Sequence, residues 1–236
     1  MTAADVGKTL VDLVAERAAA KAPFLIGIAG GVAVGKSTLA QMLADGLAQA
    51  GHPVQVVATD GFLKPNRDLE AAGLNMRKGF PETFDRDALH GFLAELAAGR
   101  TAATPVYSHV TYDIVPGETR TVDGQGVVIV EGVNVLQSSE ARACLGLALY
   151  VDAEPEHLKA WYLGRLHQII ADDPQSYFAQ LDAERRDAMF EAGWTHLNLV
   201  NLTEHIAPTA EFADVVVRKG ADHTLANVSW RKRPRH

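Results

Sequence analysis

Short, almost continuously apolar runs alternate with longer amphipathic segments along this chain. The apolar runs cover residues 24–29, 54–59, 127–130, 147–151 and 215–217, and they are rich in valine, isoleucine and leucine. Runs of this length without polar alternation are typical of strands that are buried on both faces of a parallel sheet. We therefore predict that they form the strands of one mostly parallel central sheet.

The segments between these runs carry the helical spacing of apolar residues. We expect helices over 36–49, 86–98, 155–170 and 174–192, with Gly51 and Gly99 as the stops of the first two. Before the first strand, apolar residues such as Val6, Leu10 and Val14 predict an opening helix within residues 1–22. Strands that alternate with helices predict an α/β fold whose sheet is flanked by helices on both faces.

The first apolar run leads directly into a glycine-rich loop. Residues Gly30 to Thr38 have the sequence GGVAVGKST, which matches the pattern G-x-x-x-x-G-K-S between a predicted strand and a predicted helix. In such a loop backbone N–H groups point at phosphate oxygens, and the helix N-terminus adds positive charge. We expect Lys36 to contact the β- and γ-phosphates, Ser37 to bind Mg²⁺ and Thr38 to donate near the α-phosphate. A loop that only joins strand to helix is the weaker interpretation.

The loop residues predicted to bind the nucleotide are Gly30, Gly31, Val32, Ala33, Val34, Gly35, Lys36, Ser37 and Thr38. The motif and its context predict a P-loop NTPase fold, a three-layer α/β sandwich, with ATP and Mg²⁺ as cofactors. The chain has 236 residues, of which 47% are hydrophobic, so we expect one kinase domain over 1–236.

Charge and cysteine content narrow the class of protein further. The formal net charge of -7 disfavours nucleic acid as a partner, because a phosphate backbone attracts a basic surface. Cys144 is the single cysteine, which excludes a disulfide framework and a thiolate zinc site. The sequence contains neither a secretion signal nor an apolar stretch of the ~18 residues that a membrane span needs. We therefore expect a cytoplasmic protein with no membrane partner.

Carboxylates follow several of the predicted strands. Ligands of open α/β sheets bind beyond the carboxyl ends of the strands, where Asp60, Glu131 and Asp152 stand. Asp152 lies shortly before Pro155 and suits the start of a helix. Asp60 and Glu131 are each followed by a glycine, which permits close approach of backbone or ligand. We assign Asp60 and Glu131 to the chemistry of the site, as opposed to a structural role in a turn or cap.

These residues meet the needs of a phosphoryl-transfer enzyme that acts on an alcohol. Asp60 is the candidate base or orienting group for the acceptor hydroxyl, and Glu131 is the candidate second carboxylate at the Mg²⁺. Arg165, Lys159 and His167 occur on the predicted helix after Pro155, where a mobile lid over about 155–195 would bring a cation to the developing charge. We select Arg165; a solvated helix face is the alternative.

At this level the chain resembles the bacterial type I pantothenate kinases. The matching stretches include IGIAGGVAVGKST, TDGFLKPN, GLNMRKGFPETFD, PVYSHVTYDIVPG, VVIVEGVNVLQ, YVDAEPEHLKAWYLGR, DPQSYF and RKGADH. The resemblance covers nearly the whole chain after residue 23. It implies an ATP-dependent kinase that phosphorylates pantothenate in coenzyme A biosynthesis and that forms a homodimer, with Asp60 acting on the pantothenate hydroxyl.

The resemblance also implies a set of substrate residues. By position in the family motifs they are Tyr107, His109, Tyr112, Tyr162 and Arg165, with His205 at the place of an asparagine that contacts pantothenate. From their spacing alone, Tyr107, His109 and Tyr112 form one face of a strand, and an ordinary half-buried surface is the alternative. Leu166 and Ile169 replace aromatic residues of the same pocket.

A further departure concerns regulation. Gln41 stands where the family helix carries an arginine associated with coenzyme A feedback. We therefore expect weaker inhibition by coenzyme A than in typical members, measured as the inhibition constant in a steady-state kinase assay. Tight, ATP-competitive inhibition would contradict this prediction.

Other functions remain open at this stage. His205 and the altered pocket motivate a kinase of the same group that acts on uridine, glycerate, a ketose or a phosphopentose. A regulatory NTPase is an alternative of another class, although the chain lacks an N-K-x-D element for guanine. The third alternative is a nucleotide-binding scaffold without turnover.

Overall fold

The computed structural model describes residues 3–19, 22–173, 175 and 177–231. Its α-helices are α1 (Ala3–Ala19), α2 (Lys36–Gln49), α3 (Asn66–Ala71), α4 (Arg86–Ala97), α5 (Ser139–Cys144), α6 (Pro155–Asp172), α7 (Ala183–Gly193) and α8 (Leu199–Asn201). Its strands are β1 (Phe24–Gly30), β2 (Val54–Ala58), β3 (Ala102–Ser108), β4 (Asp113–Val122), β5 (Val127–Glu131), β6 (Leu147–Asp152), β7 (Val215–Lys219) and β8 (Leu225–Trp230).

A six-stranded sheet with the order β2-β5-β1-β6-β7-β8 forms the centre of the molecule. Neighbouring strands from β2 to β7 are parallel, and β8 is antiparallel to β7. Every residue of β1 and β5 is buried, as expected for strands that are covered on both faces. The predicted mostly parallel sheet is therefore confirmed, and β8 adds an antiparallel strand at its edge.

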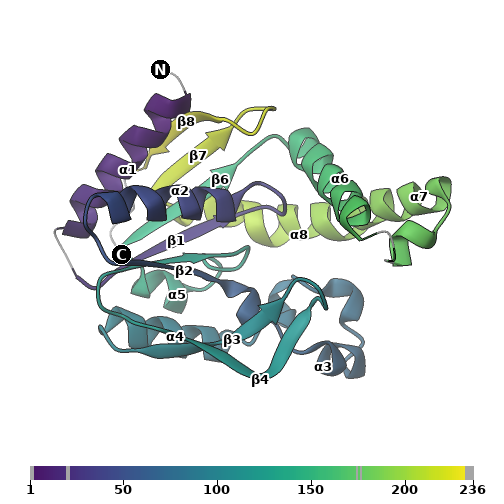
Figure 1. The fold of residues 1–236 in the computed structure, drawn as a ribbon, viewed down its shortest axis with the longest axis horizontal. Helices are drawn as coiled ribbons and strands as arrows, with labels where there is room; N and C mark the ends of the chain where they lie inside the picture. Colours follow the sequence, from purple (N-terminus) through teal and green to yellow (C-terminus); the bar gives the residue numbers. More distant parts are fainter. Residues whose placement is uncertain (1–2, 20–21, 174, 176, 232–236) are drawn as a thin grey trace.

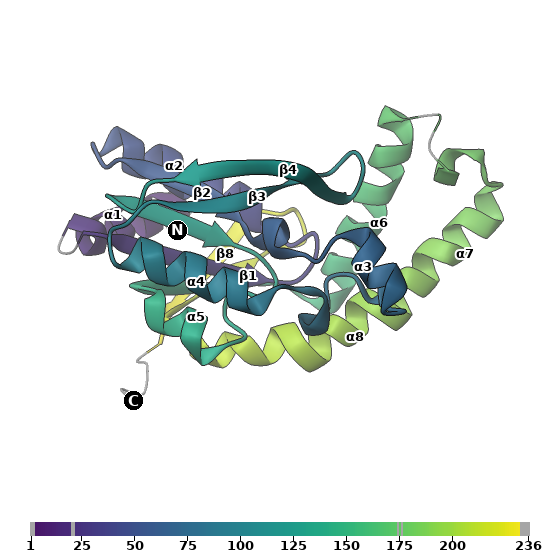
Figure 2. The same ribbon diagram turned by 90° about the horizontal axis from the view of Figure 1, so that it is seen from below.

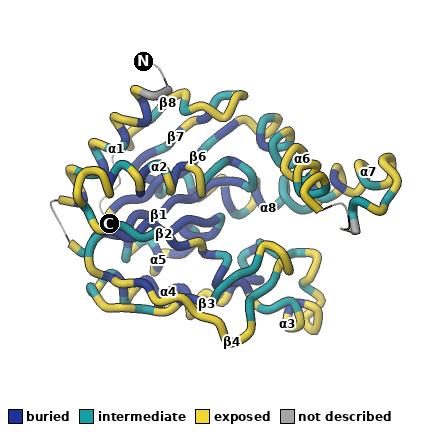
Figure 3. The backbone as a smooth tube through the Cα atoms, viewed as in Figure 1, coloured by how far each residue is buried: buried dark blue, intermediate teal, exposed yellow. Residues whose placement is uncertain are grey.

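Helices cover both faces of this sheet (Figures 1 and 2). Helices α1 and α2 pack together on one face, where α2 contacts β1, β2 and β5 and α1 contacts β8. Helices α4 and α5 lie on the other face, together with part of a long helical rod, residues 183–206, that contains α7 and α8. Figure 3 shows the buried backbone concentrated in the central strands. This is the three-layer sandwich that the sequence predicts.

The register places the carboxyl ends of the central strands side by side. Ile28 of β1 and Ala58 of β2 both pair with Glu131 of β5, and Gly30 of β1 pairs with Val151 of β6. Consequently the phosphate loop after β1, the segment after β2 and the carboxylate at the end of β5 converge at one edge of the sheet.

Helix α6 and helix α7 project from this same edge (Figure 1). In the part of the chain that the structure describes, Leu158 is the buried residue of α6, and Phe190 is that of α7. Figure 3 shows this projecting arm mostly exposed or half-buried. An arm with so little buried apolar surface has few contacts that hold it in one position, which suits a lid.

Several elements differ from the expectations. The helix expected over 174–192 begins only at Ala183, because Asp182 caps it by accepting a hydrogen bond from the backbone N–H of Arg185 at 2.8 Å. Residue 174 itself lies outside the described residues. Strand β2 ends at Ala58, and Thr59 already belongs to a 3₁₀ turn, η1 (Thr59–Phe62). Asp152 does not cap α6; it ends β6, 3.6 Å from Arg218.

The β3–β4 hairpin was not predicted as an element. Its strands form a separate two-stranded sheet with a register shift between Pro105 and Tyr107. Tyr107 lies on β3, but His109 and Tyr112 lie in the connecting turn, so the prediction that all three share one strand face is wrong. The reason is the turn itself, where Tyr112 adopts a φ of 52° and reverses the chain. Among the described helices, none is both long and apolar enough to cross a membrane.

Candidate active site

The phosphate loop joins β1 to α2 in a conformation that requires glycine at both of its ends. Gly30 has a φ of 149° and Gly35 a φ of 87°. A Cβ atom at Gly30 would lie 2.5 Å from the carbonyl oxygen of Val151, and one at Gly35 would lie 2.5 Å from Nζ of Lys219. At Gly30 the backbone of β6 leaves no room for a side chain, whereas at Gly35 the positive φ is the constraint, because the Lys219 side chain is able to move aside. The loop therefore curls at its two glycines as the motif predicts.

Lys36 begins α2 and folds back over the loop. Its Nζ donates a hydrogen bond to the carbonyl oxygen of Gly31 at 3.0 Å. Burial lowers the pKa of Lys36, an effect that Glu131 and Asp60 oppose and Arg165 reinforces. The ammonium group therefore stands among the groups predicted to carry the chemistry, at the position where it would meet phosphate oxygens.

Ser37 and Glu131 form a ready pair of oxygen ligands. The Ser37 hydroxyl donates to Oε1 of Glu131 at 2.7 Å, and Glu131 is buried at the carboxyl end of β5. Among the described residues there is no cluster of three or more histidine, cysteine, aspartate or glutamate side chains that would hold a metal by itself. A hydroxyl with a carboxylate suits Mg²⁺, which takes its remaining ligands from water and from phosphate oxygens.

Asp60 follows β2 on the turn η1, where its side chain is half-buried. The negative charge of Asp60 acts on Lys36, Lys78 and Tyr107, which places its carboxylate among the three. The glycine after it is needed for packing, since a Cβ at Gly61 would lie 2.5 Å from the carbonyl oxygen of Pro105. The close approach predicted at this glycine is therefore made by the backbone of β3.

The glycine after Glu131 is constrained even more tightly. A Cβ at Gly132 would lie 1.7 Å from Oγ1 of Thr59, which is buried and hydrogen-bonded to Oδ1 of Asn134 at 2.6 Å. We expect Gly132→Ala to destabilise the protein by about 1–3 kcal/mol, because an added methyl group must displace a buried, bonded side chain. Thermal unfolding should show the loss as a fall of roughly 2–4 °C per kcal/mol.

Gly91→Ala is the matched control for this prediction. A Cβ at Gly91 meets no atom within 4 Å, and the residue lies on the exposed side of α4. Its substitution should leave the melting temperature unchanged or raise it, since alanine favours a helix. Equal melting temperatures for Gly132→Ala and the wild type would disprove the role assigned to this glycine.

A partly open cavity of about 260 Å³ lies between these groups. It is lined on the sheet side by Lys36, Ser37, Asp60 and Glu131, and on the other sides by Lys78, Gly79, His109, Arg165, Asn198, Asn201 and Ile206, among others. The structure thus brings the predicted catalytic residues and His109 to one cavity. Its volume suits one small molecule next to the phosphate loop.

Tyr107 and Tyr112 lie beside this cavity, outside its lining. The ring of Tyr107 contacts that of His109, with 5.2 Å between centroids. Burial, reinforced by Asp60, raises the pKa of Tyr107 to about 12, so its hydroxyl stays protonated and able to donate at neutral pH. Tyr112 is 48% exposed and lines an outer groove with Leu166 and Ile169.

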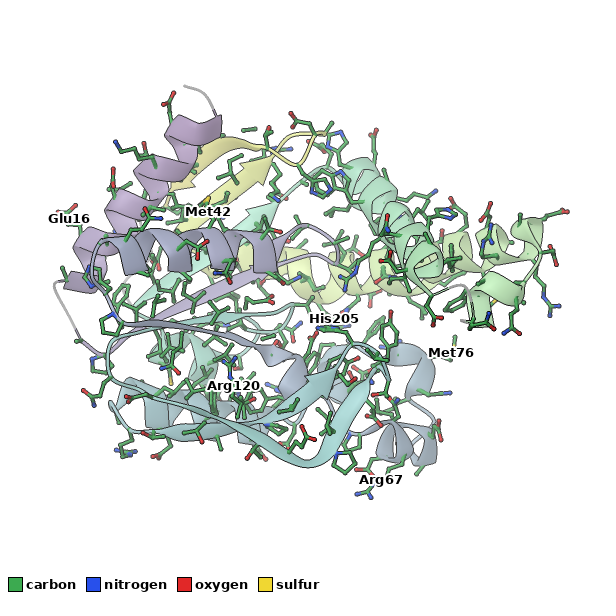
Figure 4. All side chains as sticks on the ribbon, in the orientation of Figure 1. Glu16, Met42, Arg67, Met76, Arg120 and His205 are labelled. Atoms are coloured by element: carbon green, nitrogen blue, oxygen red, sulfur yellow. The ribbon has the colours of Figure 1, made fainter. Side chains whose placement is uncertain are left out.

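Tyr162 and His205 also point elsewhere. Tyr162 packs against Trp194 at 5.8 Å between ring centroids, inside the junction of the projecting arm. The ring of His205, which is labelled in Figure 4, lies 5.8 Å from that of Phe80 between centroids. His205 lines a neighbouring groove with Glu82. The structure does not bring these two residues to the lining of the cavity that holds Asp60. Their contacts with substrate stay predictions.

Lys78 is a cavity residue that we did not single out from the sequence. Its Nζ donates to Oδ1 of Asn66 at 2.5 Å and to the backbone carbonyl of Tyr112, and it stands 5.2 Å from the centroid of the Tyr107 ring. Burial lowers the pKa of Lys78, and the negative charges of Asp113 and Asp60 oppose this shift. Lys78 ties the hairpin turn to the cavity; a lone lysine in an irregular loop carries no periodic signal.

A second, more open groove of about 670 Å³ lies on the other side of the phosphate loop. The rings of Trp161 and His223 stack in it at 3.7 Å between centroids, beside Gly35 and Thr38. Flat rings beside a phosphate loop are suited to a nucleotide base. Sequence reasoning missed both residues as a base-binding pair. One lies on α6 and the other in the turn after β7, so no local pattern joins them.

Lys219 is a further missed residue. It ends β7, is 6% exposed, and has its Nζ beside Gly35. Its side chain makes no hydrogen bond or ion pair with another described residue, and burial lowers its pKa. The strand-end rule that identified Asp60 and Glu131 would also have found Lys219, had it been applied to basic residues.

Arg165 lies between the cavity and the groove that contains Trp161 and His223, which we call the nucleotide-side groove. Its side chain is exposed on α6 and lines both of them. The other two cations considered on this helix have structural contacts, since Lys159 pairs with Glu191 at 2.6 Å and His167 contacts the ring of Phe190 at 5.7 Å. These contacts favour Arg165 as the cation that faces the chemistry.

Known proteins resemble this chain in sequence. Residues 25–168 match the model of the phosphoribulokinase/uridine kinase family. A pantothenate kinase of Streptomyces avermitilis is 47% identical over 229 residues, which cover 89% of this chain and 70% of that protein. A pantothenate kinase of Parvibaculum lavamentivorans is 44% identical over 231 residues, covering 90% of this chain and 71% of that protein.

Solved structures show the same fold. A putative fructose transport system kinase from Silicibacter sp. TM1040 superposes with a TM-score of 0.67 at 26% identity, over 90% of this chain and 95% of the other. D-glycerate 3-kinase from Cryptococcus neoformans gives a TM-score of 0.68 at 14% identity, over 94% of this chain and 99% of the other. At the lower identity only the fold is comparable.

Proposed function

This chain belongs to the phosphoribulokinase/uridine kinase family, within it to the bacterial pantothenate kinases, and we propose that it transfers the γ-phosphoryl group of ATP to a hydroxyl of pantothenate. The observation that carries the proposal is the cavity in which Asp60 and Arg165 meet Lys36 of the phosphate loop, in a chain with this degree of identity. Assembly as a cytoplasmic homodimer belongs to the same proposal, and sedimentation analysis would test the dimer.

In the proposed reaction each residue has a separate role. Asp60 orients the acceptor hydroxyl and takes its proton as the bond to phosphorus forms. Lys36 and the backbone of residues 30–35 hold the β- and γ-phosphates, while Arg165 meets charge that develops on the transferred group. Ser37 and Glu131 would hold Mg²⁺, which supplies charge neutralisation on the phosphates when bound.

The arm over about 155–195 is the part that would exclude water. Arg165 of α6 reaches both spaces, and the arm stands at the sheet edge next to the hairpin turn (Figure 2). Closure of such an arm over bound substrates would protect the phosphoryl group from hydrolysis. The whole of 1–236, including this arm, then acts as one kinase domain.

The experiment that tests the function is an acceptor-dependent assay. ADP release is measured with ATP and Mg²⁺ and with pantothenate, uridine, glycerate or a ketose as acceptor, beside an acceptor-free control. Efficient turnover of pantothenate supports the proposal. Turnover of another alcohol with silence toward pantothenate would refute the substrate, and ADP release without any acceptor would favour the regulatory NTPase.

Lys219 provides a prediction for the nucleotide side. We expect Lys219→Met to weaken ADP binding roughly 10-fold or more, because a buried ammonium beside the phosphate loop loses a charge-assisted contact with phosphate oxygens. Binding of adenosine, which lacks phosphates, should change little. Isothermal titration calorimetry with both ligands separates the two contributions.

Arg218→Gln is the control for this variant. Arg218 is the neighbour of Lys219, but its side chain faces Glu154 and Asp152 and is about half exposed, at 49%. Its removal takes away one positive charge without touching the phosphate loop. If Lys219→Met bound ADP as tightly as the wild type, Lys219 would have no part in phosphate recognition.

A further inference from the structure

The rod that lines the far side of the cavity has an irregular helical geometry. The chain continues from α7 through a π-helical turn at Trp194–Asn198, the short α8, and a second π-helical turn at Leu202–Ile206. π-helical turns are rare, and they occur often at functional sites because the extra residue re-aims side chains. Asn201 is the last residue of the segment between these two turns.

Asn201 is held in one orientation by a distant loop. Its Nδ2 donates to the carbonyl oxygen of Gly79 at 2.9 Å. Gly79 has a φ of 97°, a conformation that other residues rarely adopt, so the direction of its carbonyl is a property of that loop. A carbonyl accepts and does not donate, which fixes the amide with Nδ2 toward Gly79 and Oδ1 away from it.

Oδ1 of Asn201 has no partner. The side chain lines the cavity, the residue is 8% exposed, and Oδ1 is buried without a hydrogen bond from any described residue. Leaving a buried acceptor unpaired destabilises a protein by about 1–3 kcal/mol, so a native structure that keeps one calls for a reason.

We propose that Oδ1 of Asn201 accepts a hydrogen bond from a donor of the acceptor substrate other than the hydroxyl that is phosphorylated. This inference rests on the proposed function and names a residue that determines its specificity. Pantothenate offers two such donors, its amide N–H and its second hydroxyl. A carboxylate offers none at neutral pH, so the charged end of the substrate lies away from Asn201.

The cavity therefore holds its acceptor between two kinds of group. Asp60 approaches from the sheet edge and acts on the reacting hydroxyl, while Asn201 approaches from the helical rod and reads a second polar group. A site that is built to pair with a substrate donor discriminates strongly against an analogue that lacks it, because its own buried acceptor is then left unpaired. Small alcohols without a second donor should be poor acceptors.

The test compares two enzymes and three acceptors. The wild type and Asn201→Leu are assayed with pantothenate, with its analogue lacking the second hydroxyl, and with an analogue that carries an ester in place of the amide. We expect the wild type to discriminate against one analogue by roughly 10- to 100-fold in kcat/KM. Asn201→Leu should lose a similar factor on pantothenate, mainly in KM, and should no longer discriminate. The analogue that is rejected identifies the donor.

Two controls separate recognition from damage. Thr203→Ala alters an exposed residue of the second π-helical turn whose hydroxyl bonds only to backbone carbonyls of its own helix, and it should keep the wild-type KM. ADP affinity should be the same in all variants. The wild-type measurements with the analogues need no substitution, so they test the proposal even if Asn201→Leu folds poorly.

Two results would overturn the inference. One is a wild type that accepts both analogues as well as pantothenate; the other is an Asn201→Leu variant that discriminates as the wild type does. Failure of the proposed function is a separate result, namely no turnover of pantothenate by the wild type. In that case the same comparison is made with the alcohol that is turned over and its deoxy analogue.

Discussion

Asp60→Asn should lower acceptor-dependent turnover by roughly 10²- to 10⁴-fold. The amide nearly keeps the shape of the carboxylate but cannot take the proton of the acceptor hydroxyl. Asp60 lines the cavity with Lys36 and acts electrostatically on it, and the structure offers no other carboxylate on the turn after β2. The expected signature is a fall in kcat with the affinity for ADP retained, measured by steady-state kinetics and calorimetry.

Asp68→Asn is the matched control for this substitution. Asp68 is an exposed residue of α3 whose carboxylate accepts a hydrogen bond from Nε of its neighbour Arg67 at 3.1 Å. The same chemical change there should leave kcat unaltered. Full activity of Asp60→Asn would remove the catalytic assignment, and loss of ADP binding would indicate that Asp60 supports the nucleotide site instead.

Arg165→Ala is expected to have the second large effect, a fall in kcat of roughly 10²- to 10³-fold. The guanidinium lies where the cavity and the nucleotide-side groove adjoin, and in the proposed mechanism this is where the phosphoryl group would pass from donor to acceptor. Negative charge spreads over the transferred oxygens in the transition state, and a planar cation stabilises it. Arg165→Lys should recover only part of the rate, because a lysine makes a single point contact.

Lys159→Met separates catalysis from stability of the arm. Lys159 belongs to the same helix but pairs with Glu191 of α7 at 2.6 Å, and the two side chains are 38% and 48% exposed. Exposed ion pairs contribute about 0–1 kcal/mol, so kcat should change little. If Lys159→Met lowered kcat as much as Arg165→Ala, both effects would come from displacement of the arm, and the direct role of Arg165 would be wrong.

The phosphate loop, the sheet and two of the candidate catalytic residues could be predicted from the sequence because their signals are local. Gly30 and Gly35 are required by backbone angles, and the buried strands need apolar residues at every position. Asp60 and Glu131 follow from one rule about strand ends, since parallel strands bring their carboxyl ends to one edge. The family resemblance added the acceptor.

The elements that were missed have weak or misleading local patterns. Strand β4 contains Pro116 and Gly117 and is largely exposed, so it lacks the apolar signal of the central strands. The start of α7 depends on the cap at Asp182, and the two π-helical turns around α8 leave the regular helical period. None of these features raises the apolar periodicity on which the sequence prediction rests.

The sequence by itself determined that this chain folds as an α/β P-loop kinase with Lys36, Asp60 and Glu131 at the edge of its sheet. Only the tertiary structure decided which other side chains reach that edge. Lys78, Asn201 and Lys219 enter through contacts between segments far apart in the chain, such as the bonds from Lys78 to Tyr112 and from Asn201 to Gly79. A local sequence pattern records backbone preference and burial, whereas such contacts depend on packing between elements that no periodicity encodes.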